Sequence, residues 1–223
     1  MSEPVPAATV VLVRDGHDGM ETLMLRRNSR GAFGGMWVFP GGKVDPVDVD
    51  PDRPDDEVAA ASRAAVREAL EEAGVAVDPE GLVPLSHWTP PHQAPRRFST
   101  WFFLAPAPRG IDVAVDGGEI HEHRWLRPAD ALGRRDAGEI ELAPPTWVTL
   151  WGLEAAGDVD GAISQARARP PQRFETHVAS VEGALVALWD GDAAYHDGDV
   201  DRPGPRHRLW MLPSGWRYES TEA

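Results

Sequence analysis

The chain has 223 residues, with 36 Asp or Glu against 22 Lys or Arg and a formal net charge of −14. This balance argues against a general nucleic-acid-binding protein, because such proteins need basic surface to neutralise phosphates. The absence of cysteine excludes disulfides, thiolate metal sites and a cysteine nucleophile, and it fits a reducing cytoplasm. No run approaches the roughly 18 apolar residues of a membrane span and no signal-peptide pattern is present, so we predict a cytoplasmic protein.

Apolar and β-branched runs predict six strands in the first part of the chain, at residues 8–13, 22–27, 36–39, 82–88, 96–105 and 119–126. A turn at residues 15–19 joins the first two strands into a hairpin. Gly31, Gly34 and Gly35 predict a loop before the third strand, which ends at Pro40-Gly41-Gly42.

An Asp- and Pro-rich segment, residues 45–56, follows this strand. Proline disfavours helix in the residue before it, so we predict a loop as far as Pro54. Asp55, Asp56 and Glu57 then suit the positive end of a helix that runs to about Ala73. Its packing face is predicted to include Val58, Ala65, Val66 and Leu70. Metal binding by the Asp-rich loop itself stays open as an alternative, although the ligand spacing of a calcium loop is missing.

Three carboxylates gather near the end of this helix. Residues three and four apart share a helix face, so Glu68 is expected to lie over Glu71 and Glu72. Like charges held together are costly unless a cation lies among them, and oxygen ligands favour Mg²⁺ or Mn²⁺ over zinc. Arg67 is placed to pair with Glu71, and Gly74 supplies the left-handed residue that ends the helix. An acidic face that is merely solvated is the alternative.

Gly42 and the run from Arg67 to Val75 resemble the Nudix box of the Nudix hydrolases. The second half of the box, Arg-Glu-apolar-x-Glu-Glu-x-Gly-apolar, is matched at every defined position. In the family the glycine and the arginine are 14 positions apart, whereas Gly42 and Arg67 are 25 apart, so 11 residues are inserted. The family's other glutamate falls on Asp48 when counted from Gly42 and on Ala59 when counted back from Arg67. Neither residue is a glutamate, so that role is not transferred.

The resemblance implies an α/β protein with the Nudix fold, an α/β/α sandwich around a mixed β-sheet, and the rest of the chain is predicted to add a C-terminal helical and β extension. It also implies metal-dependent attack of water on the pyrophosphate bond of a nucleoside diphosphate linked to another group. Many family members carry a further glutamate just before the last strand of the domain, and this role is expected at Glu119, with Glu122 second. The expected catalytic residues are Glu68, Glu71, Arg67 and Glu119, and the expected ligands of Mg²⁺ or Mn²⁺ are Glu68, Glu71, Glu72 and Glu119.

Substrate contacts are expected from arginines at strand ends and from the glycines of the loop. Arg96 and Arg97 beside an aromatic residue suit a ligand with phosphate at one end and a ring at the other. The candidate set is Arg26, Arg27, Gly41, Gly42, Arg96, Arg97 and Phe98. Solvated arginines and core aromatics are the alternative at both places.

The lengthened box after Phe39-Pro40-Gly41-Gly42 resembles a branch that includes the peroxisomal coenzyme A diphosphatases. That branch's substrate pattern is partly echoed by Arg26, Arg27, Ser29 and Arg30, which favours coenzyme A-like substrates. ADP-ribose, NADH, dinucleoside polyphosphates and nucleoside triphosphates stay open. Two alternatives are not enzymes. One is a non-catalytic nucleotide-binding regulator with the same fold, and the other is an acidic structural domain. The regulator is disfavoured because such modules usually lose box glutamates, whereas all three are present.

The remainder of the chain predicts a helix start at residues 128–132, helices at 144–156 and 160–168, a break at Pro170-Pro171, and short strands at 178–181, 184–189 and 207–212. We predict a Nudix domain at residues 1–140, with residues 141–223 packed on it as helices and a β extension. The aromatic-rich tail suits either a homodimer contact or a lid, and the sequence does not decide between them.

Overall fold

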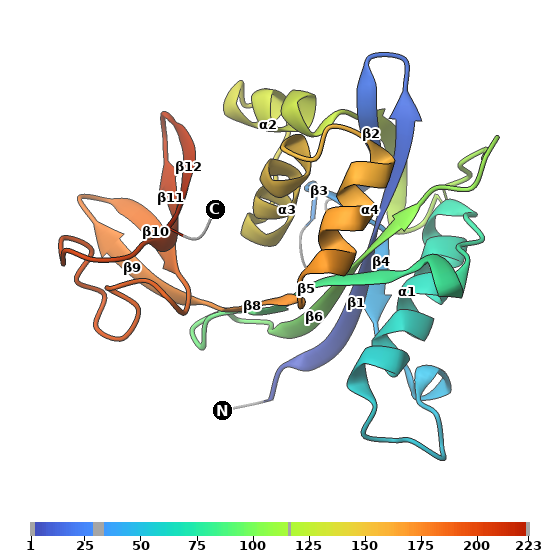
Figure 1. Ribbon diagram of the computed structural model, residues 1–223, viewed down its shortest axis with the longest axis horizontal. Helices are drawn as coiled ribbons and strands as arrows, with labels where there is room; N and C mark the ends of the chain where they lie inside the picture. Colours follow the sequence, from blue (N-terminus) through green and yellow to red (C-terminus); the bar gives the residue numbers. More distant parts are fainter. Residues whose placement is uncertain (1–2, 29–33, 116, 222–223) are drawn as a thin grey trace.

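The predicted hairpin is formed by β1 (Val5–Gly16) and β2 (Gly19–Arg27) in the computed structural model (Figure 1). The structure describes residues 3–28, 34–115 and 117–221, so Ser29, Arg30 and Gly31 of the sequence patterns lie outside the described part. Gly19 makes the turn with a φ of 123°, which a side chain rarely permits. β1 and β2 pair with each other only near this turn.

A short segment, residues 37–43, separates the other ends of the two strands. β3 (Trp37–Val38) pairs antiparallel with β2, and β4 (Gly41–Lys43) pairs antiparallel with β1 at Ala7–Thr9. We call residues 37–43 the wedge. The sequence predicts β3 but not β4, because two glycines and a lysine carry no strand pattern. The wedge brings Gly41 and Gly42 between the two long strands.

The main sheet is mixed, as predicted, and has the order β3-β2-β1-β6-β5-β8, with β4 on β1 and β7 on the other edge of β2. β1 runs parallel to β6 and β5 runs parallel to β8, whereas the other pairs are antiparallel. The bounds of the added strands are β5 (Val83–Thr89), β6 (Phe98–Pro106), β7 (Ile120–Leu126) and β8 (Gln172–Glu175). β8 was not predicted.

Helices cover both faces of this sheet (Figure 1). α1 (Glu57–Ala73) packs on one face through an apolar cluster that contains Val10, Leu12 and Leu25. The opposite face is covered by α2 (Pro128–Asp136), α3 (Pro144–Glu154) and α4 (Val159–Ala168). The result is the predicted α/β/α sandwich. No helix in the described residues has the length and apolar character needed to cross a membrane.

The packing face of α1 includes Val58, Ala65 and Val66 as predicted, but not Leu70. Its buried residues are mainly alanines, and Ala64, Ala65 and Ala69 have no exposed surface. Leu70 is 55% exposed, so its predicted place in the packing face is wrong. The alanines recur three and four residues apart and form the stripe that faces the sheet, and Leu70 lies outside that stripe. Small side chains let the helix axis lie close to the strands, which sets the depth of the glutamates on α1.

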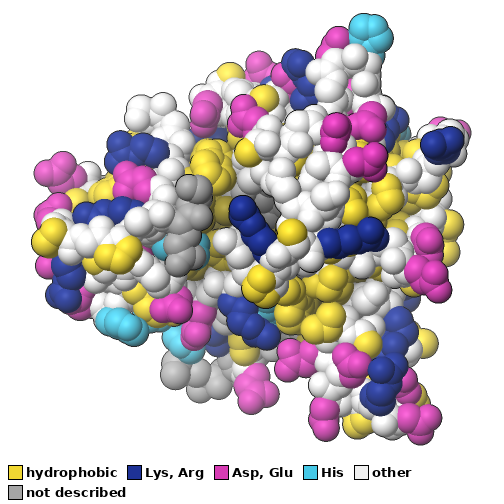
Figure 2. Space-filling view, viewed as in Figure 1, with side chains coloured by type: hydrophobic (Ala, Val, Ile, Leu, Met, Phe, Trp, Pro, Cys, Tyr) yellow, Lys and Arg dark blue, Asp and Glu magenta, His cyan; other side chains and the backbone are white. Residues whose placement is uncertain are grey.

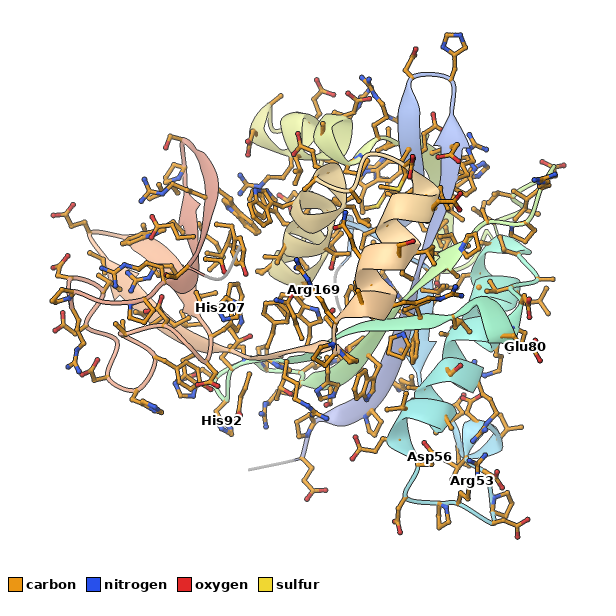
Figure 3. The ribbon with its side chains drawn as sticks, viewed as in Figure 1. Arg53, Asp56, Glu80, His92, Arg169 and His207 are labelled. Atoms are coloured by element: carbon orange, nitrogen blue, oxygen red, sulfur yellow. The ribbon has the colours of Figure 1, made fainter. Side chains whose placement is uncertain are left out.

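The ends of α1 follow the sequence expectation. The Asp56 carboxylate accepts a hydrogen bond of 3.0 Å from the Ala59 amide at the first turn. At the other end, Gly74 adopts a φ of 68°, the left-handed conformation that ends the helix. The preceding loop contains one 3₁₀ turn (Pro46–Asp48), and Arg53 lies between Asp50 and Asp56 at 3.3 Å from each (Figure 3). Acidic and basic side chains therefore lie together at this corner of the molecule (Figure 2). A second 3₁₀ turn, Pro79–Gly81, leads from α1 to β5.

The last quarter of the chain forms a second antiparallel sheet with the order β12-β11-β10-β9 (Figure 1). Its strands are β9 (His177–Val181), β10 (Ala184–Leu188), β11 (His207–Leu212) and β12 (Gly215–Ser220); the last was not predicted. Aromatic residues connect it to the main sheet: Trp88 stacks on Phe174 with ring centroids 3.7 Å apart, and the buried Trp189 meets both rings edge-on.

Candidate active site

The wedge places two glycines against the carboxylates of α1. The Gly41 amide donates a hydrogen bond of 2.9 Å to Oε2 of Glu72. A Cβ atom at Gly42 would lie 2.3 Å from Oε1 of Glu68, so a side chain at this position would displace that carboxylate. The glycines that follow the predicted strand at residues 36–39 therefore contact Glu72 and Glu68 of α1.

Glu72 is the most deeply buried carboxylate of the group, with 7% of its surface exposed. Burial, with a smaller contribution from the negative charges of Glu68 and Glu119, raises the pKa of Glu72 to about 7. The Gly41 amide and the positive charge of Arg27, whose Nη1 lies 3.7 Å from Oε1 of Glu72, act in the opposite direction. Carboxylates from α1 and from the segment before β7 are thus close enough to affect one another.

Arg67 holds the other two carboxylates of α1. Its Nη1 donates hydrogen bonds of 2.8 Å to Glu68 and 3.0 Å to Glu71. Burial raises the pKa of Glu68, whereas the contact with Arg67 opposes the change. The Glu71 side chain is 57% exposed. The predicted geometry of a guanidinium four residues before Glu71 is therefore present, and Glu68 shares that guanidinium.

Asp48 anchors Arg67 from the inserted segment. Its carboxylate accepts hydrogen bonds of 3.2 Å from Nε and 2.8 Å from Nη2 of Arg67, and it is 3% exposed. Burial alone would raise the pKa of Asp48, but hydrogen bonds from Arg67 and from the Asp45 amide together lower it. Sequence reasoning gave Asp48 no role because it is not a glutamate. The family spacing counted from Gly42 nevertheless pointed to Asp48, whose carboxylate, although on a shorter side chain than that of glutamate, still binds Arg67.

Glu119 lies just before β7 and forms an ion pair with Arg27 at the end of β2. Its side chain is 66% exposed, and its backbone carbonyl accepts a hydrogen bond of 2.8 Å from the Asn28 amide. Arg27 therefore contacts both Glu119 and Glu72, two carboxylates from distant parts of the chain.

The remaining candidate residues lie elsewhere. Arg26 lies on the opposite face of the sheet from Arg27, beside Trp37 and 3.5 Å from Glu122. Phe98 pairs with Val5 in the β1–β6 register, four residues along β1 from the Thr9 partner of Gly41, a separation of about 13 Å. Arg97 contacts the Pro90 carbonyl at 3.4 Å, and Arg96 is exposed. The structure therefore brings Arg27, Gly41 and Gly42 to the glutamates, but not Arg26, Arg96, Arg97 or Phe98.

Divalent-cation chemistry suits the donors at this site. The side chains are all carboxylates, the harder donors that Mg²⁺ and Mn²⁺ prefer. The repulsion that Glu68 and Glu119 exert on Glu72 accords with a cation among these carboxylates. In the arrangement described here, no three Asp, Glu or His side chains of the described residues are grouped to hold an ion. Arg67 and Arg27 are their partners instead.

Substitution of the two wedge glycines by alanine is expected to have different effects. At Gly41 the new Cβ would lie 2.4 Å from the Ala8 carbonyl, so the β1–β4 pairing must shift and unfolding should become easier by about 1–3 kcal/mol. At Gly42 the obstacle is the flexible end of Glu68, so stability should change little while kcat falls about tenfold or more. Urea unfolding and steady-state kinetics on both variants test this. Equal losses of stability would contradict the assignment of Gly42 to the carboxylate site.

Comparison with known proteins agrees with this arrangement. The family model of the NUDIX domain matches residues 3–145. A NUDIX hydrolase from Alicyclobacillus acidocaldarius is similar in structure with a TM-score of 0.67 and 26% identity, covering 74% of this chain and 97% of that one. A Caenorhabditis elegans relative named "Putative nudix hydrolase 7" is 25% identical over 211 residues, covering 78% of this chain and 70% of the relative.

The fold is also shared with the NUDIX domain of Shewanella oneidensis NrtR, which was crystallised with ADP ribose. That similarity has a TM-score of 0.51 at 16% identity and covers 76% of this chain and 91% of that domain. The match of the domain model extends over well more than half of the chain. Together with the sandwich fold and the glutamate-bearing helix, it shows that the chain belongs to the Nudix family and is a Nudix hydrolase.

Proposed function

We propose that this enzyme hydrolyses the pyrophosphate bond of a nucleoside diphosphate linked to another group, in a reaction that depends on a divalent metal ion. The observation that carries the proposal is that Arg27 contacts both Glu72 of α1 and Glu119 before β7, two carboxylates from distant segments of the chain. Such crowding of carboxylates is costly in a protein unless it serves a cation or a proton transfer.

Glu68, Glu71, Glu72 and Glu119 would hold the metal, with Mg²⁺ or Mn²⁺ the ions that suit their oxygen donors. A divalent ion bound there would polarise a phosphoryl oxygen, lower the pKa of a water molecule and neutralise developing charge. The Gly41 amide keeps Glu72 in place. Arg67, itself anchored by Asp48, orients Glu68 and Glu71.

The proton of the attacking water passes to Glu119 or to one of the glutamates of α1. Glu119 is the most exposed of these groups and reaches the site from the segment before β7. Arg27 contacts both Glu72 and Glu119, and its guanidinium is therefore placed beside any phosphate that approaches them.

Coenzyme A-like substrates are our preferred class, on the basis of the lengthened box and the pattern Phe39-Pro40-Gly41-Gly42. ADP-ribose, NADH and nucleoside polyphosphates are the alternatives within the same chemistry. The ion pair between Asp48 and Arg67 supports a functional site in the lengthened box, because the inserted segment supplies a carboxylate that binds this arginine.

The test is a panel of these compounds incubated with the enzyme and Mg²⁺ or Mn²⁺, with product nucleotides separated by chromatography. We expect hydrolysis of at least one linked diphosphate, complete dependence on the added metal, and loss of turnover with excess chelator. Failure to hydrolyse any diphosphate on the panel, or hydrolysis that persists in chelator, would contradict the proposal.

A further inference from the structure

A polar cavity of about 300 Å³ lies behind the catalytic glutamates, on the face of β2 and β7 that α2 covers. It is open to solvent and is lined by Arg26, Trp37, Glu122, Arg124, Arg134, Glu139 and Ile140. Its volume is enough for a phosphate group with part of a sugar. Of these residues, the sequence indicated Arg26 as a substrate contact and Glu122 as the second choice after Glu119 for the additional glutamate.

Basic groups predominate in the cavity although the whole chain carries a net charge of −14. Its three guanidinium groups face two carboxylates. Glu122 lies 2.6 Å from Arg124 and 3.5 Å from Arg26, so Arg124 is its close partner and Arg26 is held only loosely. Glu139 accepts a hydrogen bond of 2.9 Å from Arg134. The side chains of Arg26, Arg124 and Arg134 are 52%, 42% and 41% exposed, so all three are accessible to a ligand.

The cavity is adjacent to the proposed site through β2 and β7. Arg26 points into the cavity, and the next residue, Arg27, contacts Glu72 on the other face of the sheet. The last residue of β2, Arg27, lies beside the first residue of β7, Ile120, which immediately follows Glu119. Neighbouring residues of β2, Arg26 and Arg27, therefore reach the cavity and the proposed site from opposite faces of the sheet. Trp37 lies under the Arg124 guanidinium, 5.1 Å from it, and holds that arginine at the cavity floor.

We propose that this cavity binds a phosphate monoester that the substrate carries in addition to its diphosphate. The inference rests on the proposed function for the diphosphate, and it narrows the substrate class to nucleotides with a separate phosphate on the sugar. Planar guanidinium groups bind a phosphate dianion through paired charge-assisted hydrogen bonds, and three of them converge here from β2, β7 and α2. Arg124 and Arg134 are the specificity-determining residues, because neither lies on the face that holds the glutamates.

Binding without turnover tests the cavity independently of hydrolysis. We expect adenosine 3′,5′-bisphosphate to bind more tightly than adenosine 5′-monophosphate to the unaltered protein, measured by isothermal titration calorimetry. The double variant Arg124→Gln/Arg134→Gln should weaken binding of the bisphosphate by about 10- to 100-fold and leave the monophosphate unchanged. The matched control, Arg109→Gln/Arg167→Gln, removes the same charge from exposed positions that do not line the cavity. It should bind both ligands normally.

Glu139→Gln is expected to change bisphosphate affinity in the opposite direction to the arginine double variant. It releases Arg134 from its carboxylate partner and should tighten bisphosphate binding by about 2- to 5-fold. A purely structural network of ion pairs predicts no such gain. Unchanged or weaker binding in Glu139→Gln, or equal loss for both ligands in the arginine double variant, would overturn the proposal.

Kinetics then connect the cavity with the reaction. Coenzyme A and 3′-dephospho-coenzyme A share the same diphosphate and differ in one monoester phosphate. We expect the arginine double variant to lower kcat/KM for coenzyme A by about 10- to 100-fold and to spare the dephosphorylated compound. Equal kcat/KM values for the two compounds in the unaltered enzyme would refute the specificity claim even if both are hydrolysed. Absence of hydrolysis with retained bisphosphate binding would instead count against the proposed function alone.

Discussion

Glu72→Gln is expected to lower kcat for metal-dependent diphosphate hydrolysis by about 10³-fold while the protein stays folded. Glutamine keeps the shape of the side chain and can still accept the hydrogen bond from the Gly41 amide. It removes the negative charge that interacts with Glu68, Glu119 and Arg27. The loss should therefore appear in kcat and in the metal concentration needed for half-maximal rate, both measured by steady-state kinetics.

Glu80→Gln is the matched control, because Glu80 is exposed and lies in the turn that follows α1 (Figure 3). It should retain full activity. Near-normal turnover in Glu72→Gln would rule out the assigned role of Glu72, and a comparable loss in both variants would show that the effect is not specific to the site.

The same variant has an expected effect on stability in metal-free buffer. Burial raises the pKa of Glu72 from 4.5 to about 7, so the folded protein holds this proton more tightly than the unfolded chain. The contribution to stability is complete below the unfolded value and is lost as pH rises through about 7. Glutamine does not titrate, so its Tm should rise relative to the unaltered protein between about pH 5 and pH 8. A parallel pH dependence of Tm in the two proteins would contradict the raised pKa.

Trp189→Ala is expected to lower the free energy of unfolding by about 3–5 kcal/mol, the largest stability effect among the substitutions considered. Trp189 has no exposed surface, and its indole Nε1 donates a hydrogen bond of 3.0 Å to Thr176. Its ring meets Trp88 and Phe174 edge-on, with centroid distances of 5.6 and 5.2 Å. Removal would leave a cavity where the second sheet contacts the main sheet. Urea unfolding followed by circular dichroism gives the measurement.

Trp151→Ala is the control for the loss of an indole. Trp151 is 37% exposed and contacts Tyr218 at a centroid distance of 4.8 Å, so its removal should cost about 1 kcal/mol. The prediction that residues 141–223 pack on the catalytic domain as one unit requires a single unfolding transition in the unaltered protein. Two separate transitions, with Trp189→Ala affecting only one, would contradict it.

The sequence was most informative where function and local structure coincide. The spacing of the residues from Arg67 to Gly74 predicts the helix, its end and the contact between Arg67 and Glu71, but not the contacts of Arg67 with Glu68 and Asp48. The main strands were also predictable, because their apolar runs are long. Leu70 was misplaced because hydrophobicity was given more weight than periodicity, whereas alanines at the right spacing form the buried stripe.

Contacts between distant segments could not be deduced in the same way. Nothing local in Arg27 indicates that it meets Glu72, since 45 positions of chain and two strands separate them. β4 and β8 are strands only because other strands lie beside them, and their own residues carry little β preference. The opposite directions of Arg26 and Arg27 follow from the alternation of side chains along β2, yet which face holds the glutamates depends on where α1 packs.

The wedge also explains how this chain accommodates its insertion. The extra residues leave the wedge at Lys43, which is paired with Ala7, and rejoin the body of the protein where Asp48 binds Arg67 and Asp56 caps α1. Both junctions are fixed by contacts of their own, so the length of the connection is decoupled from the position of the glutamates. The length of the segment between these contacts can therefore change without moving the glutamates of α1.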